Sequence, residues 1–349
     1  MFSVALLRRG PESETQKTGI GRYADAAKRG IIAGGADCEN IYYVFEKHIG
    51  FLKGIRKGFI DPLMDLINSN GKNDIYHAAD ELCGLYLPLL RGKRVVTFHH
   101  ITRPGEDISG IFGRILWKIS AAISVRYADK ILAVSPQTRD EIVEMYGLDP
   151  NDIEVLPFEI GRQFRILEDV KRSMTVGYAG SLIPRKNVAS LIRSFKKVTG
   201  MPGTADARLV ICGEGPERDE LTELVKELNI AENVEFISGL TDEEIVRLYN
   251  SVSAYVQPAK HEGLSLTIIE AQRCRAPVLY FEDARIPDEV KKYAVPCSGE
   301  DGLAEQMHRC LTDERYRNAV ADAAFGHAND FGEDFGERIV EIYKDLLSR

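Results

Sequence analysis

Two adjacent cations, Arg185 and Lys186, stand at the end of a loop that leaves a predicted strand and enters a predicted helix. Arginine offers a planar fork for phosphate oxygens and lysine a point charge, so together they could neutralise much of a diphosphate. An isolated Arg-Lys pair is more often a solvated basic turn. Its place at the carboxyl end of a strand nevertheless favours phosphate binding.

A second segment that could bind phosphate follows the predicted strand that ends near Gln257. Ser265 is predicted to cap the next helix, and the backbone N–H groups of Leu266 and Thr267 would then point out of the helix start. Such N–H groups, together with the helix dipole, bind a phosphate well. Two loops of one sheet edge therefore predict one anion site.

Glu270 lies in the same helix among apolar neighbours, on a segment predicted to be buried almost all round. Burial of a bare carboxylate costs several kcal/mol, so this group needs partners. A ribose diol offers two hydroxyl donors, and an arginine at the edge of the core is the alternative. We favour the ribose.

Alternating strand and helix patterns position these residues. The second half of the chain predicts strands at 174–179, 208–212, 234–237, 254–257 and 278–281. Helices are predicted between them, with Asn187 as the cap of one and Thr241 opening a capping box in another. The first half predicts strands at 4–7, 74–77, 95–98 and 130–134. This order is typical of parallel sheets covered on both faces, which bind ligands at the carboxyl ends of their strands.

The length of 349 residues predicts two domains. The periodicity lapses around 156–173, which places the boundary near 165: an N-terminal domain at 1–165 and a C-terminal domain at 166–330. A last helix at about 332–347, within 331–349, is expected to pack back on the N-terminal domain.

Composition excludes several classes of protein. The net charge is −8, and residues 1–160 hold 20 Lys+Arg against 21 Asp+Glu, which is the wrong balance for general nucleic-acid binding. The six cysteines form no C-x-x-C pair, which disfavours a zinc knuckle or a disulfide framework. The N-terminus lacks the order of a signal peptide, and no apolar run is long enough to span a membrane. We therefore expect a cytoplasmic protein.

The segment from Glu262 to Glu270 resembles the Glu, seven residues, Glu motif of the family 4 retaining glycosyltransferases. These have the α/β GT-B fold, in which two Rossmann-like domains with parallel sheets face a central cleft. Residues 180–187 resemble that family's phosphate loop, and 213–216 resemble its next turn. The resemblance covers essentially 173–330 and is specific through the spacing of all three motifs.

The resemblance implies roles for residues of the C-terminal domain. Arg185 and Lys186, with Gly180, Ser181, Leu266 and Thr267, would hold the donor diphosphate, and Glu270 the ribose. The transferred sugar would meet Glu262, Gly263, Leu264 and Ser265. The family often has glycine where Ser265 stands and an aromatic residue where Leu264 stands, so the resemblance fixes the class more firmly than the sugar.

The N-terminal domain carries two weaker similarities. Residues 95–100 resemble a strand of the family that ends in His-Asp, which implies that His99 lies beside the donor sugar; His100 replaces the aspartate. The doublet could also be a strand end or a metal site, but alternate strand residues point to opposite faces, which disfavours a metal. Gly19 and Gly21 resemble the family's first glycine-rich loop, although a lone G-x-G is a weak signal.

The predicted function is transfer of a hexose from a UDP- or GDP-linked sugar to a glycan or glycolipid hydroxyl, with retention by front-face attack. Glu262, Arg185, Lys186 and His99 would be catalytic, and no cofactor or metal is expected, because no D-x-D pair occurs. The alternatives are a non-catalytic nucleotide-sugar-binding partner subunit and a sugar-nucleotide epimerase on the same fold. The joint presence of Glu262, Arg185 and Lys186 speaks against the silent subunit.

Residues 48–60 and 108–128 contain basic and apolar residues but no acids. Such segments can lie on an anionic membrane, which would be the inner face here. For 108–128 we favour the alternative of a core helix beneath the strand at 130–134. For 48–60 we favour neither membrane contact nor the alternative of a core segment.

Overall fold

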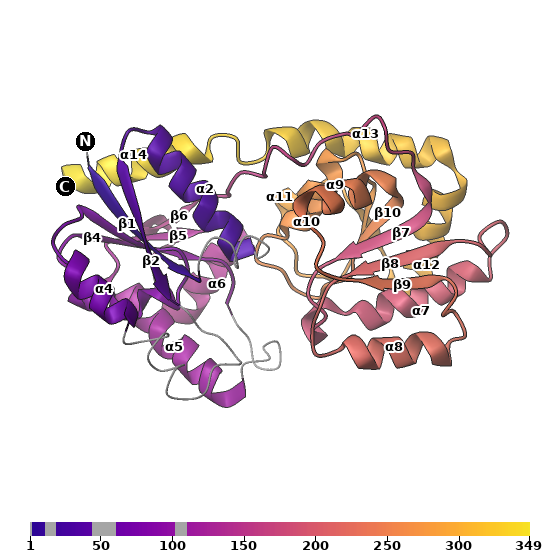
Figure 1. The fold of residues 1–349 in the computed structure, drawn as a ribbon, viewed down its shortest axis with the longest axis horizontal. Helices are drawn as coiled ribbons and strands as arrows, with labels where there is room; N and C mark the ends of the chain where they lie inside the picture. Colours follow the sequence, from indigo (N-terminus) through magenta and orange to yellow (C-terminus); the bar gives the residue numbers. More distant parts are fainter. Residues whose placement is uncertain (1, 11–18, 44–60, 102–109) are drawn as a thin grey trace. The chain divides into compact units, whose positions relative to one another are not determined.

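The computed structural model describes residues 2–10, 19–43, 61–101 and 110–349. The chain forms two compact units. The first unit comprises Met1–Glu159 and Gly332–Arg349, and the second comprises Ile160–Phe331. Each unit is considered by itself (Figure 1).

The first unit is built on a parallel sheet whose strands, within the described residues, have the order β2-β1-β3-β4-β5-β6. The strands are β1 (Ser3–Arg9), β2 (Asp37–Tyr43), β3 (Ile75–Ala78), β4 (Lys93–Phe98), β5 (Lys130–Ala133) and β6 (Ile153–Val155). The helices are α2 (Gly19–Ala33), α4 (Asp61–Ser69), η2 (Cys83–Leu89), α5 (Gly110–Tyr127), α6 (Pro136–Tyr146), η3 (Pro150–Asp152) and α14 (Phe335–Ser348). Helices α2 and α14 cover one face, and α4 and α5 the other (Figure 1).

The second unit repeats this plan with the strand order β12-β11-β10-β7-β8-β9, again parallel throughout the described residues. Its strands are β7 (Ser173–Ala179), β8 (Arg208–Cys212), β9 (Val234–Ile237), β10 (Val252–Gln257), β11 (Val278–Phe281) and β12 (Val295–Cys297). Its helices are η4 (Pro184–Lys186), α7 (Val188–Thr199), α8 (Arg218–Glu227), α9 (Asp242–Ser251), α10 (Leu266–Arg273), α11 (Asp288–Lys291), α12 (Gly299–Thr312) and α13 (Glu314–Asp330).

The predicted strands are confirmed in both halves, three of them to the residue: 208–212, 234–237 and 278–281. The capping box of α9 is also confirmed, because Thr241 Oγ1 accepts from the Glu244 N–H at 3.3 Å and the Glu244 carboxylate accepts from the Thr241 N–H at 2.7 Å. Strands β2, β6 and β12 were not predicted; they are short or interrupted by polar residues.

The last helix, α14, packs on α2 of the first unit, where two glycines allow close approach. A Cβ on Gly30 would lie 2.7 Å from Gly336 Cα. A buried polar contact fixes the same helix to the sheet, since Tyr343 Oη lies 2.5 Å from His77 Nδ1. Burial lowers the pKa of His77 to about 3, so this ring is neutral at pH 7.

Over the described residues, no helix is both long enough and apolar enough to cross a membrane. One side of helix α5 belongs to the core of the first unit, where Trp117 and Ala121 lie in the same apolar cluster as Ile131 and Ala133. Trp117, Ala121 and Ser124 are buried, but Ile115 and Ile119 on the opposite side are about half exposed. This helix is amphipathic by burial, and it packs chiefly against η2 through its buried side. Residues 48–60 lie outside the described residues.

Candidate functional site

The strand order of the second unit brings the two predicted phosphate-binding loops together. The chain runs from β7 outward through β8 to β9, and then returns to place β10 on the other side of β7. The loops that follow β7 and β10 therefore leave the same edge of the sheet in opposite directions. Parallel sheets bind ligands in the crevice at such a switch point. Arg185 and Lys186 follow β7, and Glu262 follows β10.

The loop after β7 is held in place by the turn after β8. The Leu182 N–H donates to the Glu214 carbonyl at 2.8 Å, and the Gly180 N–H donates to the Cys212 carbonyl at 2.9 Å. A Cβ on Gly213 would lie only 1.8 Å from the Gly180 carbonyl oxygen. Glycine is therefore required by backbone contact, and the turn at 213–216 acts as a support for the loop that carries the two cations.

We expect Gly213→Ala to destabilise the protein by about 2 kcal/mol, since the new methyl group must displace the loop backbone. Gly302→Ala is the matched control. Gly302 lies within helix α12, and a Cβ there would meet its nearest atom at 3.6 Å. This change should therefore be neutral or slightly stabilising. Urea unfolding compares the two variants; equal stability would contradict the supporting role.

Glu262 contacts both cations in the structure. Its Oε2 lies 3.0 Å from Arg185 Nη1, and its Oε1 pairs with Lys186 Nζ. The Arg185 guanidinium also donates to the His261 carbonyl at 2.5 Å. All three side chains are largely buried, with 15% of Arg185, 15% of Lys186 and 7% of Glu262 exposed. Two cations thus share one carboxylate, which leaves the cluster with one excess positive charge.

The backbone fixes this arrangement independently of the side chains. The Lys260 N–H donates to the Arg185 carbonyl at 3.0 Å, which ties the segment after β10 to the loop after β7. The Glu262 N–H donates to the Arg285 carbonyl at 2.9 Å, and the Arg285 N–H returns a bond to the Lys260 carbonyl at 2.9 Å. The segment that carries Glu262 is therefore held on one side by the loop of the two cations and on the other by Arg285.

The cluster sets the ionisation of its members. Burial alone would raise the pKa of Glu262, but the charges of Lys186 and Arg185 and the hydrogen bonds from both lower it to about 2. Burial also lowers the pKa of Lys186, in part offset by the Glu262 charge. Glu262 is therefore an anion throughout the physiological range, held by charges that could equally hold a phosphate.

We expect Glu262→Gln to cost about 3 kcal/mol of unfolding free energy at pH 7, since the pKa falls from 4.5 to about 2 on folding and a tenfold change in proton affinity is worth about 1.4 kcal/mol. A pKa that is lower in the folded state stabilises above the unfolded value of 4.5 and loses its effect as the pH falls toward 2. The difference between wild type and variant in urea unfolding should therefore shrink at about pH 3.5. An equal difference at both pH values would contradict it.

The start of α10 corrects the predicted capping. Ser265 is at the N-cap position, but its φ is +66° and its side chain makes no capping bond. Its Oγ instead accepts from Gln257 Nε2 at 2.5 Å, and Gln257 also reaches Thr267 Oγ1 at 3.1 Å. Asn187 before α7 behaves likewise, with φ +53° and no capping bond. Side-chain caps need an extended N-cap residue, which a left-handed residue is not.

The left-handed backbone at Ser265 accounts for the glycine that the family often has at this position. Glycine adopts a positive φ without penalty, whereas serine pays for it. Here the buried Gln257 amide holds the serine in that conformation. Gln257 was not singled out from the sequence. A polar residue at the end of a buried strand was the available signal.

Glu270 is buried, with 2% of its surface exposed. The Tyr249 hydroxyl from α9 donates to its Oε2 at 3.2 Å. The Tyr249 hydroxyl is therefore one partner of this carboxylate. Gly263 and Leu264 are also buried, while Leu266 and Thr267 are partly exposed and Ser181 is exposed. The roles predicted for these residues toward a ligand stay predictions.

His99 follows β4 of the first unit and is mostly buried. Its Nε2 lies 2.9 Å from the Ala79 carbonyl oxygen and so donates to it. The Tyr23 ring packs edge-on at 4.9 Å between centroids. Burial lowers the pKa of His99 to about 4, which makes the ring neutral at pH 7. Gly19 and Gly21 belong to the first turn of α2 rather than to a loop.

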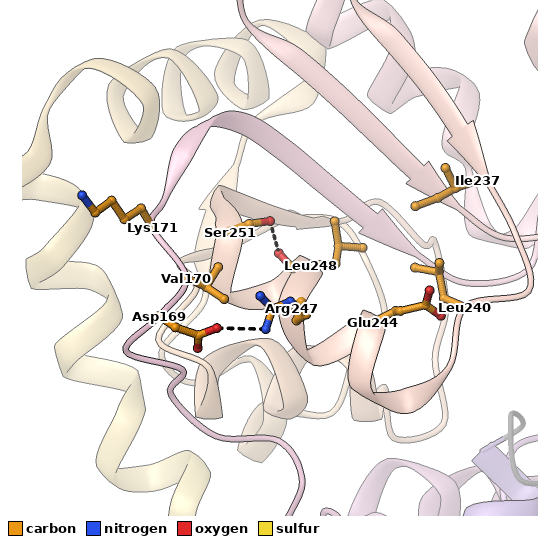
Figure 2. A pocket seen from close by; sticks show the side chains of 9 residues that line it. All are labelled: Asp169, Val170, Lys171, Ile237, Leu240, Glu244, Arg247, Leu248 and Ser251. Carbon is orange, nitrogen blue, oxygen red and sulfur yellow. Dashed lines mark hydrogen bonds and ion pairs between the residues drawn. The ribbon is translucent and has the colours of Figure 1, made fainter.

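A separate hollow of the second unit lies beside α9 and has a volume of about 470 Å³ (Figure 2). Its floor is apolar, with Ile237, Leu240 and Leu248. Arg247 and Asp169 form a 3.0 Å ion pair across it, and Lys171 points away. The hollow contains none of the predicted site residues. In the described part of the chain, no group of three or more His, Cys, Asp or Glu side chains could hold a metal ion.

Two doubly wound units of this kind define the GT-B class of proteins. A sucrose-phosphate synthase from Thermosynechococcus elongatus superposes with a TM-score of 0.80 at 15% identity, covering all of both chains. Anabaena HepE, solved with UDP and glucose, superposes at 0.77 with 14% identity, over 99% of this chain and all of the other. These structures support the fold.

Sequence comparison identifies the family. Residues 160–327 match the model of the glycosyl transferases group 1, and residues 34–158 match that of glycosyltransferase family 4. A 2-deoxystreptamine N-acetyl-D-glucosaminyltransferase from Streptomyces fradiae is 24% identical over 257 residues. The match covers 68% of this chain but only 61% of that relative. The chain belongs to the group 1 glycosyltransferases.

Proposed function

We propose that the protein is a retaining glycosyltransferase that moves a hexose from a UDP- or GDP-linked sugar to a hydroxyl of a glycan or glycolipid. The observation that carries this proposal is the cluster of Arg185, Lys186 and Glu262 at the switch point of the second unit. Two cations against one carboxylate suit an anionic ligand. The HepE structure contains UDP and glucose, and the Streptomyces relative is named for transfer of an amino sugar.

The geometry supports a division of labour in donor binding. Arg185 and Lys186 would meet the diphosphate, with the amides of Leu266 and Thr267 at the start of α10 beside them. Glu270 would accept hydrogen bonds from the ribose hydroxyls in place of the one from Tyr249. Glu262 would contact the transferred sugar. Gly180 and Ser181 would line the phosphate side, and Gly263, Leu264 and Ser265 the sugar side.

Catalysis would then rest on positioning and charge stabilisation. As the bond from the sugar to the diphosphate breaks, negative charge grows on the departing phosphate, where Arg185 and Lys186 already lie. The acceptor hydroxyl attacks the face that the phosphate leaves, and its proton passes to that phosphate. Retention follows from attack on the same face. We propose that no metal ion takes part.

The decisive experiment is incubation with UDP- and GDP-sugars and a mixture of glycan acceptors, with EDTA in one arm. Acceptor-dependent release of nucleotide and retained anomeric configuration in the product, read by NMR, are expected in both arms. Isomerised donor without acceptor would identify an epimerase. Nucleotide binding without turnover would identify a silent subunit, and inversion would overturn the mechanism.

Membrane contact through 48–60 stays a prediction, as does a location at the inner face of the membrane. Sedimentation with anionic liposomes at low salt should pellet the protein if this segment docks on lipid. A protein that stays in the supernatant at every lipid concentration would rule the contact out.

A further inference from the structure

The first unit also has a switch point, between β1 and β3. The chain runs from β1 to β2 on one side and then crosses to place β3 on the other side of β1. Arg9 is the last residue of β1, and Asp80 and Glu81 stand just beyond β3, after Ala79. His99 follows the next strand, β4. The carboxyl ends of three neighbouring strands thus carry a cluster of polar side chains, of which Arg9, Asp80 and Glu81 have no role in the predicted donor site.

The cluster consists of a partly exposed arginine side chain on buried carboxyls. Arg9 Nε lies 2.5 Å from Asp80 Oδ2, and the Arg9 side chain is 34% exposed while Asp80 is fully buried. Asp80 Oδ1 accepts from the Cys83 N–H at 2.9 Å. Glu81 is buried beside it and accepts from Trp117 Nε1 at 2.7 Å. The carboxyls therefore cannot meet a ligand, but they fix the arginine that can.

The two switch points share a design but differ in charge. Arg185 and Lys186 outnumber Glu262 in the second unit, whereas in the first unit Arg9 is balanced by Asp80. Burial and the Asp80 charge raise the pKa of Glu81 to about 7, so Glu81 adds up to one further negative charge. The neighbouring Arg8 is neutralised by Asp25 at 2.6 Å. The first cluster is therefore neutral or slightly negative.

We propose that Arg9, held by Asp80, is a contact for the acceptor in the first unit, and that it binds uncharged sugar or polyol hydroxyls rather than phosphate or carboxylate groups. The inference rests on the proposed function, since it names the acceptor's chemistry. A guanidinium whose charge is cancelled by a buried carboxylate still offers directed N–H donors to hydroxyl oxygens. It offers no net charge to an anion.

Saturation-transfer NMR on the full chain tests this, in the presence of saturating UDP. Methyl α-glucoside and methyl α-mannoside serve as neutral probes, and glucose 6-phosphate as the anionic probe. Wild type should bind at least one neutral probe more tightly than the phosphate. Arg9→Lys keeps the charge and the apolar stem but loses the planar fork, and should weaken neutral-probe binding at least about fivefold. Arg91→Lys, on the exposed turn before β4, is the matched control.

Asp80→Asn provides the sharper arm. The asparagine can still accept from the Cys83 N–H, so the turn is kept. Because loss of the Asp80 charge would let Glu81 ionise in its place, this variant also carries Glu81→Gln, which leaves the charge of Arg9 uncancelled. Binding of glucose 6-phosphate should then rise at least about fivefold. Thermal unfolding confirms that each variant is folded. If the ion pair between Arg9 and Asp80 were merely structural, its loss would lower the stability of the protein but would not change its preference between neutral and anionic probes.

Three results would each overturn the inference. The first is neutral-probe binding that is unchanged in Arg9→Lys, and the second is a wild type that prefers glucose 6-phosphate or binds neither neutral probe. The third is the absence of any gain of phosphate binding in the Asp80→Asn variant. These failures are separable from failure of the proposed function. If wild type binds neither UDP nor GDP, the donor site is wrong. If wild type binds UDP but Arg9→Lys binds the neutral sugars as tightly as wild type does, only the acceptor contact is wrong.

Discussion

Lys186→Ala should weaken binding of the nucleoside diphosphate about thirtyfold, which corresponds to about 2 kcal/mol. The lysine is largely buried, and its ammonium group faces a carboxylate that a phosphate could replace. Loss of one charge-assisted hydrogen bond to phosphate accounts for an effect of this size. Isothermal titration with UDP and GDP measures it directly.

Lys196→Ala is the control for this prediction, because Lys196 is an exposed lysine of the adjacent helix α7. Its removal should leave the dissociation constant within about twofold of wild type, as expected for a surface charge that is screened by salt. If Lys186→Ala binds as tightly as Lys196→Ala, the phosphate role of the loop after β7 is wrong.

Glu262→Gln should lower kcat at least about a hundredfold while nucleoside diphosphate binding stays as tight as in wild type or becomes tighter. Glu262 is the anion that occupies both cations in the structure, so a diphosphate must compete with it. Glutamine removes the competing charge. Turnover falls because the contact with the transferred sugar is lost where charge develops in the transition state.

Glu300→Gln is the matched control, since Glu300 also faces two cations. Arg193 lies at 3.9 Å and Lys197 at 3.8 Å, but on the surface of α12. Surface pairs contribute little, so both kcat and affinity should be unchanged. A fall in affinity with unchanged kcat for Glu262→Gln would instead make Glu262 a binding residue only.

Local patterns determined much of the fold. The strands at 208–212 and 234–237 are short apolar runs between clear turn residues, and the Thr241 capping box is readable because its partners are three residues apart. Strand β12 has a proline and a neighbouring polar segment, so its pairing with β11 depends on the rest of the sheet. A strand that depends on such tertiary pairing cannot be recognised from the few residues of its own sequence.

The candidate site also combines features that the sequence predicts with features that only the tertiary structure determines. The loops after β7 and β10 were predictable because parallel strands end at one edge of a sheet. The pairing of Glu262 with both Arg185 and Lys186 was not, because it depends on a side-chain geometry fixed by the Lys260 and Arg285 backbone bonds. The caps at Asn187 and Ser265 were wrong because residue type does not reveal a positive φ.

Arg9 and Asp80 illustrate what only the topology provides. They are 71 residues apart, and neither belongs to a motif. Their meeting follows from the crossing of the chain between β1 and β3, which places the two strand ends side by side. The same rule that located the cations of the second unit thus locates a second polar cluster.

A crystal structure of the protein with bound UDP or GDP is the most direct test of the central claim. The claim predicts the two phosphates against Arg185 and Lys186, within hydrogen-bond distance of the amides that open α10 and with the ribose toward Glu270. A diphosphate bound elsewhere, with the Glu262 pairs intact and the switch point of the second unit empty, would contradict it.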